Sequence, residues 1–184
     1  MLSMRLLAFI VILSVALATA PRAKEPRVNG DRLAFELPGL DGEIVASTDA
    51  RFKDKVLFVT IWGTWCPPCW SEIPTFVELQ DRYADQGLVI VAIAFERDTL
   101  PEARRERLRD FSKQHKINYL VLDGGATTEF SNALPMIEDV KGLPIEIMID
   151  RSGLVIESRN GYGYKKRWAR NLERDLRELL AETD

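Results

Sequence analysis

The sequence predicts an α/β domain built on a mixed β-sheet that is covered on both faces. Two short, continuous apolar runs, 56–61 and 88–95, are rich in β-branched residues and predict buried strands. Each is followed by a segment with helical periodicity, 67–83 after the first run and 101–116 after the second. Nearer the C-terminus, two strand-like runs joined by a short turn predict an antiparallel hairpin before a final helix. At 184 residues the chain is long enough for one such domain with a short appendage.

Residues 1–20 have the pattern of an export signal. A single positive charge at Arg5 precedes an almost wholly apolar run, which ends in small residues. Cleavage after Ala18 is favoured, because cleavage after Ala20 would leave Pro21 next to the cut bond. The apolar run is 15 residues long, shorter than the ~20 of a comfortable membrane span, and an uncleaved anchor is the alternative. We therefore expect an extracytoplasmic protein, in a bacterial periplasm, either soluble or anchored to the inner membrane.

The export signal is followed by an expected linker and then by the domain. Residues 21–30 are rich in proline and charge and predict the linker, so the domain is expected to cover 31–184. At its start, the runs 33–37 and 43–46 lie on either side of an Asp-Gly turn and predict a β-hairpin.

The two central helices are predicted from their apolar positions and their prolines. The helix over 67–83 begins with two prolines, where a missing N–H costs little, and Pro74 is expected to kink it. The helix over 101–116 is highly charged, with Leu108 and Phe111 on its buried side.

The C-terminal half continues the alternation. A short strand is expected over 119–122, and the segment 126–140 is ambiguous, with some helix that is broken by a proline. The runs 145–149 and 154–158 form the antiparallel hairpin, and a helix over 164–182 closes the chain. Its apolar stripe consists of Trp168, Leu172, Leu176 and Leu179.

The charge pattern argues against a nucleic-acid partner. The net charge is −3 and no block of basic residues is present. The mixed charges of the 101–116 helix predict a solvated, ion-paired face. The charged residues of this face are Glu102, Arg104, Arg105, Glu106 and Arg107. His115 is assigned to the same solvated surface.

Cys66 and Cys69 carry the strongest functional signal, and they are the only two cysteines. A Cys-x-x-Cys pair between an apolar strand and a helix is typical of a thiol–disulfide exchange site. A disulfide that only braces a fold gains most by closing a long loop, and this loop holds two residues. A zinc site needs four ligands, and His115 is the one histidine available to join the two thiols. The pair is therefore expected to be reactive, with no metal and no cofactor.

The order of elements, with Trp-Cys-x-x-Cys at the end of the first core strand, resembles the thioredoxin fold. Further motifs are similar to its exported TlpA/ResA/DsbE-like branch. They are Phe35, Leu37, Leu40, Asp41 and Gly42 in the hairpin, the stretch 62–69, Glu72 with Pro74, Gly142-Leu143-Pro144, and 149–153. The resemblance covers roughly residues 30–183. It implies a mixed sheet flanked by helices, an N-terminal β-hairpin, and an αβ insertion between the cysteine pair and a cis-proline. The chain departs from the family pattern at Ile145-Glu146, where small residues or Thr are usual, and in the 75-residue spacing from Cys69 to Pro144.

The cysteines are assigned different roles from their places in the predicted helix. Cys66 at the helix N-terminus would gain from the helix dipole and from unpaired N–H groups, so it is expected to be the exposed nucleophile. Cys69 lies one turn further on and is expected to resolve the mixed disulfide. The resemblance also implies a cis Leu143–Pro144 bond that faces the cysteines and leaves the Leu143 backbone free to pair with an extended substrate.

Glu72 is a candidate proton acceptor for Cys69. It lies three residues after Cys69, and a partly buried carboxylate there would have a raised pKa. Thr60 occupies the place where many thioredoxins carry a buried Asp, which favours Glu72 as its substitute. The alternative is that Glu72 is an acidic residue favoured by the helix dipole in a first turn.

Residues around the cysteines are expected to contact the substrate. The candidates are Trp65, Pro67, Pro68 and Leu143. Trp62 and Trp65 could shield the disulfide and form an apolar rim for substrates, and core packing is the alternative for Trp62. For Trp70 the sequence does not decide between a surface rim and packing.

The sequence thus predicts an exported thiol–disulfide oxidoreductase acting as a reductant. The resemblance implies electrons from a membrane thiol carrier, and protein disulfides as substrates, including the haem-site cysteines of apocytochrome c. Pro67 and Pro68 stand where strong oxidants often carry a thiolate-stabilising His, which favours a reductant. The alternatives are a disulfide oxidase or isomerase and a copper-handling protein, for which His115 is poorly placed. A thiol peroxidase is less favoured, because the Thr-x-x-Cys context is absent.

Overall fold

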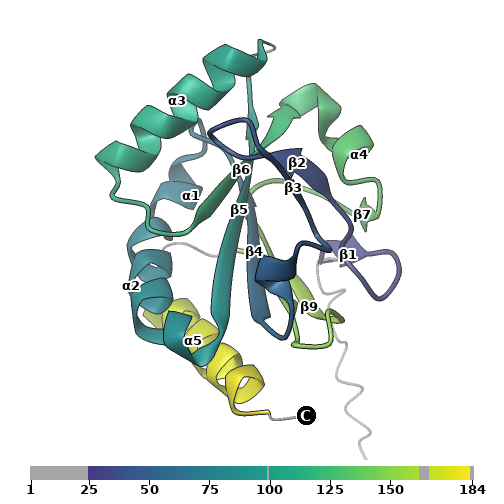
Figure 1. Cartoon of the computed structure of the whole chain (residues 1–184), viewed down its shortest axis with the longest axis vertical. Helices are drawn as coiled ribbons and strands as arrows, with labels where there is room; N and C mark the ends of the chain where they lie inside the picture. Colours follow the sequence, from purple (N-terminus) through teal and green to yellow (C-terminus); the bar gives the residue numbers. More distant parts are fainter. Residues whose placement is uncertain (1–24, 99, 162–165, 183–184) are drawn as a thin grey trace, which may run out of the picture.

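A five-stranded mixed sheet in the order β6-β5-β4-β8-β9 forms the centre of the molecule (Figure 1). The computed structural model describes residues 25–98, 100–161 and 166–182, so the expected export signal lies outside the described residues. The strands are β4 (Val56–Trp62), β5 (Leu88–Glu96), β6 (Leu120–Ala126), β8 (Ile145–Ile149) and β9 (Val155–Asn160). β4, β5 and β6 are parallel, whereas β8 and β9 run antiparallel to their neighbours, so the sheet is mixed, as predicted.

Helices cover one face of this sheet. They are α1 (Pro67–Trp70), α2 (Ile73–Tyr83), α3 (Pro101–Gln114) and α5 (Lys166–Ala181), and a short 3₁₀ turn, η2 (Ala84–Gln86), follows α2. Alternate side chains of a strand point to opposite faces, so Phe58 of β4 packs with Phe76 of α2 and Leu176 of α5. The parallel crossovers from β4 to β5 and from β5 to β6 both step in one direction, which places α2 and α3 on the same face.

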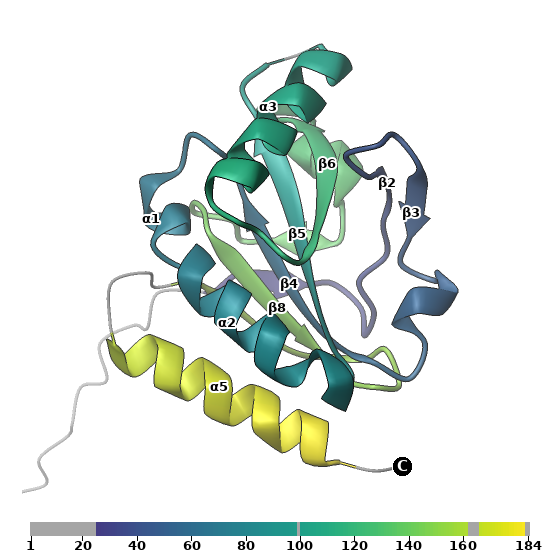
Figure 2. The ribbon, with the colours of Figure 1, turned by 60° about the vertical axis from the view of Figure 1, so that its left-hand side comes forward.

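The N-terminal hairpin and a short helical segment cover the other face (Figure 2). These elements are β2 (Glu36–Pro38), β3 (Ile44–Ala46), η1 (Ala50–Phe52), η3 (Thr127–Glu129) and α4 (Phe130–Ala133). Phe35, Val45 and Phe52 pack here against Val59 and Ile61, the β4 side chains opposite to Phe58. The predicted hairpin is confirmed, with strand pairs from Glu36–Ala46 to Pro38–Ile44.

Part of the segment expected to be a linker is docked on the domain. β1 (Arg27–Val28) pairs with β7 (Ile137–Glu138). The Glu25 carboxylate accepts hydrogen bonds from the Asn160 backbone and side chain, at 3.0 and 3.2 Å. These contacts tie residues 25–28 to β7 and β9.

Two predicted helices differ from expectation in detail. The helix over 67–83 is broken at Ser71-Glu72 into α1 and α2, because Pro74 lacks the N–H that would continue the helix and crowds the preceding turn. Arg104, expected on a solvated face, is buried instead, and its Nε donates to Asp123 at 2.8 Å. The reason is spacing, since residue 104 lies one turn from the buried Leu108 on the same side of α3.

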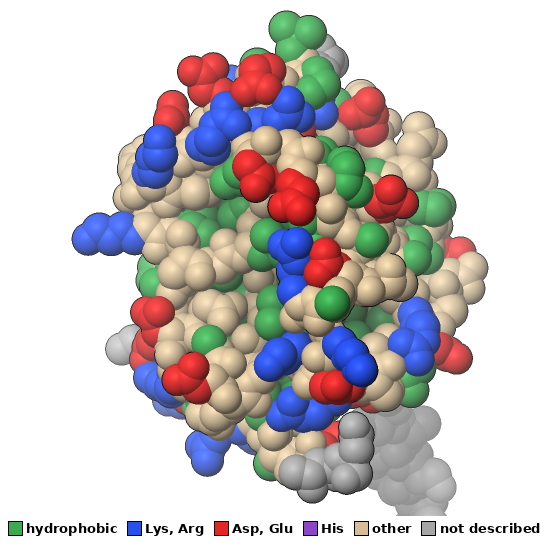
Figure 3. Space-filling view, viewed as in Figure 1, with side chains coloured by type: hydrophobic (Ala, Val, Ile, Leu, Met, Phe, Trp, Pro, Cys, Tyr) green, Lys and Arg blue, Asp and Glu red, His purple; other side chains and the backbone are tan. Residues whose placement is uncertain are grey.

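The surface carries mixed charge. Over α3, Lys and Arg side chains are interspersed with Asp and Glu (Figure 3). Arg105 pairs with Glu102 at 2.7 Å, as the charge pattern predicted, whereas Arg107 pairs at 2.6 Å with Asp98, which precedes the helix. Within the ranges that the structure describes, no helix is long and apolar enough to cross a membrane.

Candidate active site

Cys66 and Cys69 form a disulfide at the carboxyl end of β4, the central strand of the sheet. Their Cα atoms are 5.4 Å apart. In this oxidised state Cys66 is 4% exposed and Cys69 is 3% exposed, so the expected greater exposure of Cys66 is not seen. Both side chains pack into the cluster that also holds Trp62, Ile73 and Leu108, which explains why neither stands out from the surface.

The start of α1 offers Cys66 fewer N–H groups than the sequence suggested. Cys66 is the N-cap, and an N-cap side chain ordinarily accepts from the second or third residue of the helix. The first two residues, Pro67 and Pro68, have no N–H. The N–H groups of Cys69 and Trp70 both donate to the Cys66 carbonyl, at 3.0 and 3.4 Å. The expectation of unpaired N–H groups around the Cys66 thiolate is therefore wrong, and α1 is only four residues long, too short for a strong dipole.

The loop before Cys66 is held by the end of β5. The Glu96 carboxylate accepts from the Thr64 backbone N–H and from the Thr64 hydroxyl, each at 2.7 Å. The Trp65 indole N–H donates to the Phe95 carbonyl at 2.8 Å, and the Arg97 guanidinium lies 4.9 Å from the centre of a Trp65 ring. Sequence reasoning missed Glu96, although an acid that ends an apolar parallel strand was an available signal.

Gly63 lets the Trp65 ring fold back against the loop. A Cβ atom at position 63 would lie 2.5 Å from Trp65 Nε1 and 2.7 Å from the Phe95 carbonyl oxygen. Only glycine leaves room for the indole to reach Phe95. The Trp-Gly-Thr-Trp sequence therefore fixes the shape of the loop that leads into the cysteines.

The Leu143–Pro144 bond is cis, as the resemblance implied. The Pro144 carbonyl accepts from the Gly161 N–H at 2.9 Å, which ties this loop to the end of β9. Leu143 packs against the cluster that contains both cysteines. Among the described residues, no backbone hydrogen bond involves Leu143, so its N–H and carbonyl are available to a partner.

Glu72 lies in the break between α1 and α2 and is fully buried. Its N–H donates to the Cys69 carbonyl at 3.2 Å. Among the described residues, neither carboxylate oxygen has a hydrogen-bond partner. Burial raises the pKa of Glu72 to about 9; the charge of Glu146 adds to the rise and Arg159 opposes it. Because Glu72 is buried and its side chain makes no capping hydrogen bond, a stabilising interaction with the helix dipole does not account for its position. Its role in proton transfer stays a prediction.

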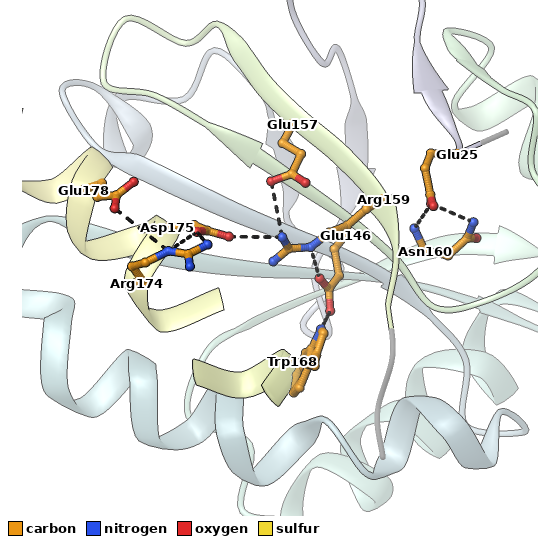
Figure 4. Close-up of polar contacts among 9 residues, drawn as sticks. All are labelled: Glu25, Glu146, Glu157, Arg159, Asn160, Trp168, Arg174, Asp175 and Glu178. Atoms are coloured by element: carbon orange, nitrogen blue, oxygen red, sulfur yellow. Dashed lines mark hydrogen bonds and ion pairs between the residues drawn. The ribbon is translucent and has the colours of Figure 1, made fainter. Parts of the chain in front are cut away.

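Glu146 and Arg159 were not predicted as site residues, and they lie in one row across the sheet with Thr60. Glu146 of β8 pairs with Thr60 of β4 on one side and with Arg159 of β9 on the other. Glu146 is 1% exposed. Figure 4 shows its carboxylate between Arg159 and Trp168, whose Nε and Nε1 atoms donate at 2.8 and 2.9 Å. The available signal was a glutamate within the apolar run of β8, at the position where the chain departs from the family pattern.

The remaining tryptophans and His115 have distinct surroundings. Trp62 is buried in the core, which favours the packing interpretation, whereas Trp70 is 40% exposed. The Trp70 indole donates to the Thr64 carbonyl at 3.0 Å. His115 is not simply solvated, since its ring stacks on Phe111 with centroids 4.1 Å apart. The rings of Trp70, Phe111 and His115 line a surface hollow of about 690 Å³ next to the cysteine loop.

The four residues expected to contact the substrate are all at least partly exposed, and their contact with substrate stays a prediction. Pro67 and Pro68 are exposed, and Trp65 and Leu143 are half-buried. In the parts of the chain that the structure describes, no three His, Cys, Asp or Glu side chains are grouped so as to hold a metal ion. The site therefore consists of a disulfide, a cis-proline loop and two buried carboxyl groups.

The chain is similar to known thiol–disulfide oxidoreductases. The model of the Redoxin family matches residues 20–176. The thiol-disulfide oxidoreductase ResA of Bacillus thuringiensis subsp. konkukian is 30% identical over 129 residues, which are 69% of this chain and 66% of that protein. The thiol:disulfide interchange protein DsbE of Pseudomonas aeruginosa is 29% identical over 151 residues, or 82% of this chain and 76% of that protein. The chain thus spans just under two thirds of the length of ResA.

Solved structures show the same architecture. A thiol:disulfide interchange protein of the thioredoxin family from Chlorobium tepidum superposes with a TM-score of 0.64 and 28% identity. The match covers 83% of this chain and 97% of that structure. The predicted thioredoxin-like fold is confirmed.

Proposed function

The chain belongs to the Redoxin family, in the TlpA/ResA/DsbE-like branch of thioredoxin-fold thiol–disulfide oxidoreductases, and from this membership we propose that it is an exported reductant of selected protein disulfides. The observation that carries the proposal is the Cys66–Cys69 disulfide at the end of the central strand, next to a loop whose Leu143 backbone is available for pairing. An extended substrate segment would add to this loop by main-chain hydrogen bonds and bring its own disulfide to Cys66.

The protein would first be reduced by a dithiol donor. A donor thiolate attacks the Cys66 sulfur, the bond to Cys69 breaks, and Cys69 leaves as a thiolate that takes a proton from Glu72. The second donor thiol then attacks the donor's own sulfur in the mixed disulfide. This step releases the donor as a disulfide and leaves both cysteines reduced.

The reduced protein would then pass the electron pair to its substrate. The Cys66 thiolate attacks one sulfur of the substrate disulfide, and the other substrate sulfur leaves as a thiolate. Cys69 gives its proton to Glu72 and attacks Cys66, which re-forms the protein disulfide and releases the second substrate thiolate. Two electrons have moved from the donor to the substrate, and the Glu72 proton has returned.

The surroundings of Cys66 favour a protein that reduces its substrates over one that oxidises them. A strong oxidant stabilises its reduced form by stabilising the thiolate. Here Pro67 and Pro68 remove two N–H groups from the helix start, and the remaining two are taken by the Cys66 carbonyl. The thiolate gains little from them, so the disulfide is the relatively stable state.

We infer the donor, the substrate and the compartment from the family resemblance and from the N-terminal sequence pattern. A membrane thiol carrier would supply electrons, because an oxidising compartment would otherwise keep the pair oxidised. Apocytochrome c is the substrate that the ResA and DsbE resemblance favours. Residues 1–20 would direct the protein to the periplasm, as a cleaved signal or as an inner-membrane anchor.

Equilibration with glutathione redox buffers tests the direction of electron flow. We expect a potential near that of thioredoxin, about −270 mV, and far from the about −120 mV of strong oxidants. A value at the oxidising end would support the oxidase alternative instead.

A trapping experiment tests the roles of the two cysteines. Cys69→Ala, expressed with its own N-terminus in a bacterium that has a periplasm, should accumulate mixed disulfides with substrates, and the Cys66→Ala control should not. Trapping by Cys66→Ala alone would reverse the two roles.

A further inference from the structure

The buried carboxylate of Glu146 has hydrogen-bond donors on both of its oxygens. Arg159 Nε donates to Oε2 at 2.8 Å and Trp168 Nε1 donates to Oε1 at 2.9 Å (Figure 4). Arg159 is itself fixed from the other side by Glu157 and Asp175, each 3.2 Å from Nη1. Burial raises the pKa of Glu146, whereas the Arg159 guanidinium and the Trp168 indole N–H oppose this rise, because their hydrogen bonds to the two oxygens stabilise the anion.

The Glu72 carboxyl lies next to this anion. A Cβ atom placed on Gly161 would be 2.5 Å from Glu72 Oε1, 3.1 Å from Glu146 Oε1 and 2.6 Å from Pro144 Cγ. The two carboxyl groups and the ring of the cis-proline therefore converge on the space that a Cβ atom of residue 161 would occupy. Glycine leaves the gap that lets both carboxyl groups approach the same point.

Two adjacent buried carboxyl groups cannot both be ionised without a large cost. Glu146 holds the donors, whereas neither oxygen of Glu72 has a partner among the described residues. The proton of the pair is therefore expected on Glu72. The other polar or titratable groups facing the pair are Thr60 of β4, Tyr119 before β6, and Arg159 with its partners Glu157 and Asp175.

We propose that Glu146, fixed by Arg159 and Trp168, is a positioning residue for thiol–disulfide exchange, which keeps the buried Glu72 carboxyl protonated so that it can protonate Cys69 when the disulfide opens. The inference rests on the proposed function. In that step the Cys66–Cys69 bond breaks and its electron pair stays on the Cys69 sulfur. The Glu72 proton moves to that sulfur, and Glu72 becomes a carboxylate that can take the proton back when the disulfide re-forms.

Protonation of Glu72 is also supported by its pKa of about 9, raised first by burial and then by Glu146. A pKa near that of a thiol makes proton exchange between Glu72 and Cys69 nearly balanced in both directions. An isolated Glu72 in the same break would lack the second contribution. Glu146 thus has an effect on the exchange site without touching the sulfur atoms.

Carboxyl ¹³C NMR of the full chain, purified oxidised, tests the inference on the groups themselves. In the wild type at pH 7, we expect the Glu72 carboxyl to be protonated and the Glu146 carboxyl to be ionised. Glu146→Gln keeps an acceptor for Trp168 but removes the charge next to Glu72, and it should lower the Glu72 titration midpoint by about one pH unit or more. The pH profile of the rate at which the disulfide is opened by dithiothreitol should move in the same direction.

Glu157→Gln is the matched control. It removes a carboxylate from the same Arg159, but from an exposed position, and should leave the Glu72 midpoint in place. An unchanged midpoint in Glu146→Gln, or an ionised Glu72 in the wild type at pH 7, would overturn the inference. The wild-type measurement needs no variant, so it decides even if Glu146→Gln does not fold. Because the NMR readout is independent of substrate and potential, failure of the proposed reductase function would be seen separately, in the glutathione equilibrium.

Discussion

Glu96 accepts two hydrogen bonds from Thr64, one from its backbone N–H and one from its hydroxyl, both at 2.7 Å. The pair joins the carboxyl end of β5 to the loop that leads into Cys66. Glu96 is 2% exposed, so water cannot easily replace either bond. The position of the cysteine loop therefore depends on a residue 30 positions further along the chain than Cys66.

Replacement of Glu96 should loosen this loop. Glu96→Ala leaves the Thr64 N–H and hydroxyl without their partner, at an expected cost of about 1–3 kcal/mol in the free energy of unfolding. Because the loop carries Trp65 and Cys66, the rate of thiol–disulfide exchange should fall as well. Urea unfolding and insulin-disulfide reduction measure the two effects. Glu106→Ala, on the exposed surface of α3, is the control and should change neither; equal effects of the two variants would contradict the assignment.

Gly161 should be intolerant of a side chain. In Gly161→Ala the new Cβ would lie 2.5 Å from Glu72 Oε1 and 2.6 Å from Pro144 Cγ, so the carboxyl or the proline loop must move. We expect a loss of about 1–3 kcal/mol in stability, as for overpacked core sites, together with slower exchange. Gly142→Ala is the matched control, because nothing lies within 4 Å of a Cβ there. If Gly161→Ala behaved like Gly142→Ala in urea unfolding and in exchange, the convergence of Glu72 and Pro144 on Gly161 would be wrong.

Glu72 should make the folded protein less stable as the pH rises. Its pKa in the folded protein is raised to about 9 from an ordinary value of 4.5, so between these values the folded state holds a proton that the unfolded state has lost. The contribution of Glu72 to stability is complete below about pH 4.5 and is lost progressively up to about pH 9. One such proton corresponds to at most about 1.4 kcal/mol per pH unit.

Urea unfolding at several pH values measures this contribution. Glu72→Gln cannot titrate, so the wild type should lose stability relative to this variant as the pH rises from 5 to 9. Glu106→Gln, at an exposed position, should follow the wild type. A constant difference between the wild type and Glu72→Gln across this range would show that the carboxyl is not the source of the slope.

The strands and the site motifs could be predicted because each has a local signal. β4 and β5 are continuous apolar runs, and the Cys-x-x-Cys and Gly-Leu-Pro motifs each lie within a few residues. Arg104 was placed on the wrong side of α3 because its ion pair with Asp123 joins residues 19 positions apart. The Glu72–Glu146 pair could not be predicted for the same reason, since only the fold brings β8 against the break between α1 and α2. Long-range pairing of polar side chains leaves little local pattern.

The break between α1 and α2 is an intermediate case. Pro74 predicted a kink, but not that the break would bury Glu72 or leave α1 four residues long. The shortness of α1 then changes the chemistry expected of Cys66. The main influence on the Cys66 thiolate is therefore the presence or absence of single N–H groups, and not the helix dipole.

Pro68 should be the proline that limits the acidity of Cys66. An N-cap side chain accepts from the N–H of the second or third helical residue; here the second is Pro68, and the third, Cys69, donates to the Cys66 carbonyl. Pro68→Ala restores an N–H at the second position and should let it donate to the thiolate. Pro68 is exposed, so the change removes little packing. A hydrogen bond to a charged group contributes about 1.5–3 kcal/mol, which corresponds to about 30–60 mV in the potential of the pair.

Pro67→Ala is the matched control for this prediction, because it restores an N–H at the first helical position, which an N-cap side chain does not ordinarily use. Glutathione equilibration should give a less reducing potential for Pro68→Ala than for Pro67→Ala, and alkylation of single-Cys66 variants across pH should show a lower thiol pKa. Both variants keep the apolar surroundings of the disulfide, so a difference between them isolates one N–H group. Equal potentials for the two variants and the wild type would mean that the prolines do not set the poise of the pair, and the preference for reduction would then have to arise from the buried Glu72 carboxyl.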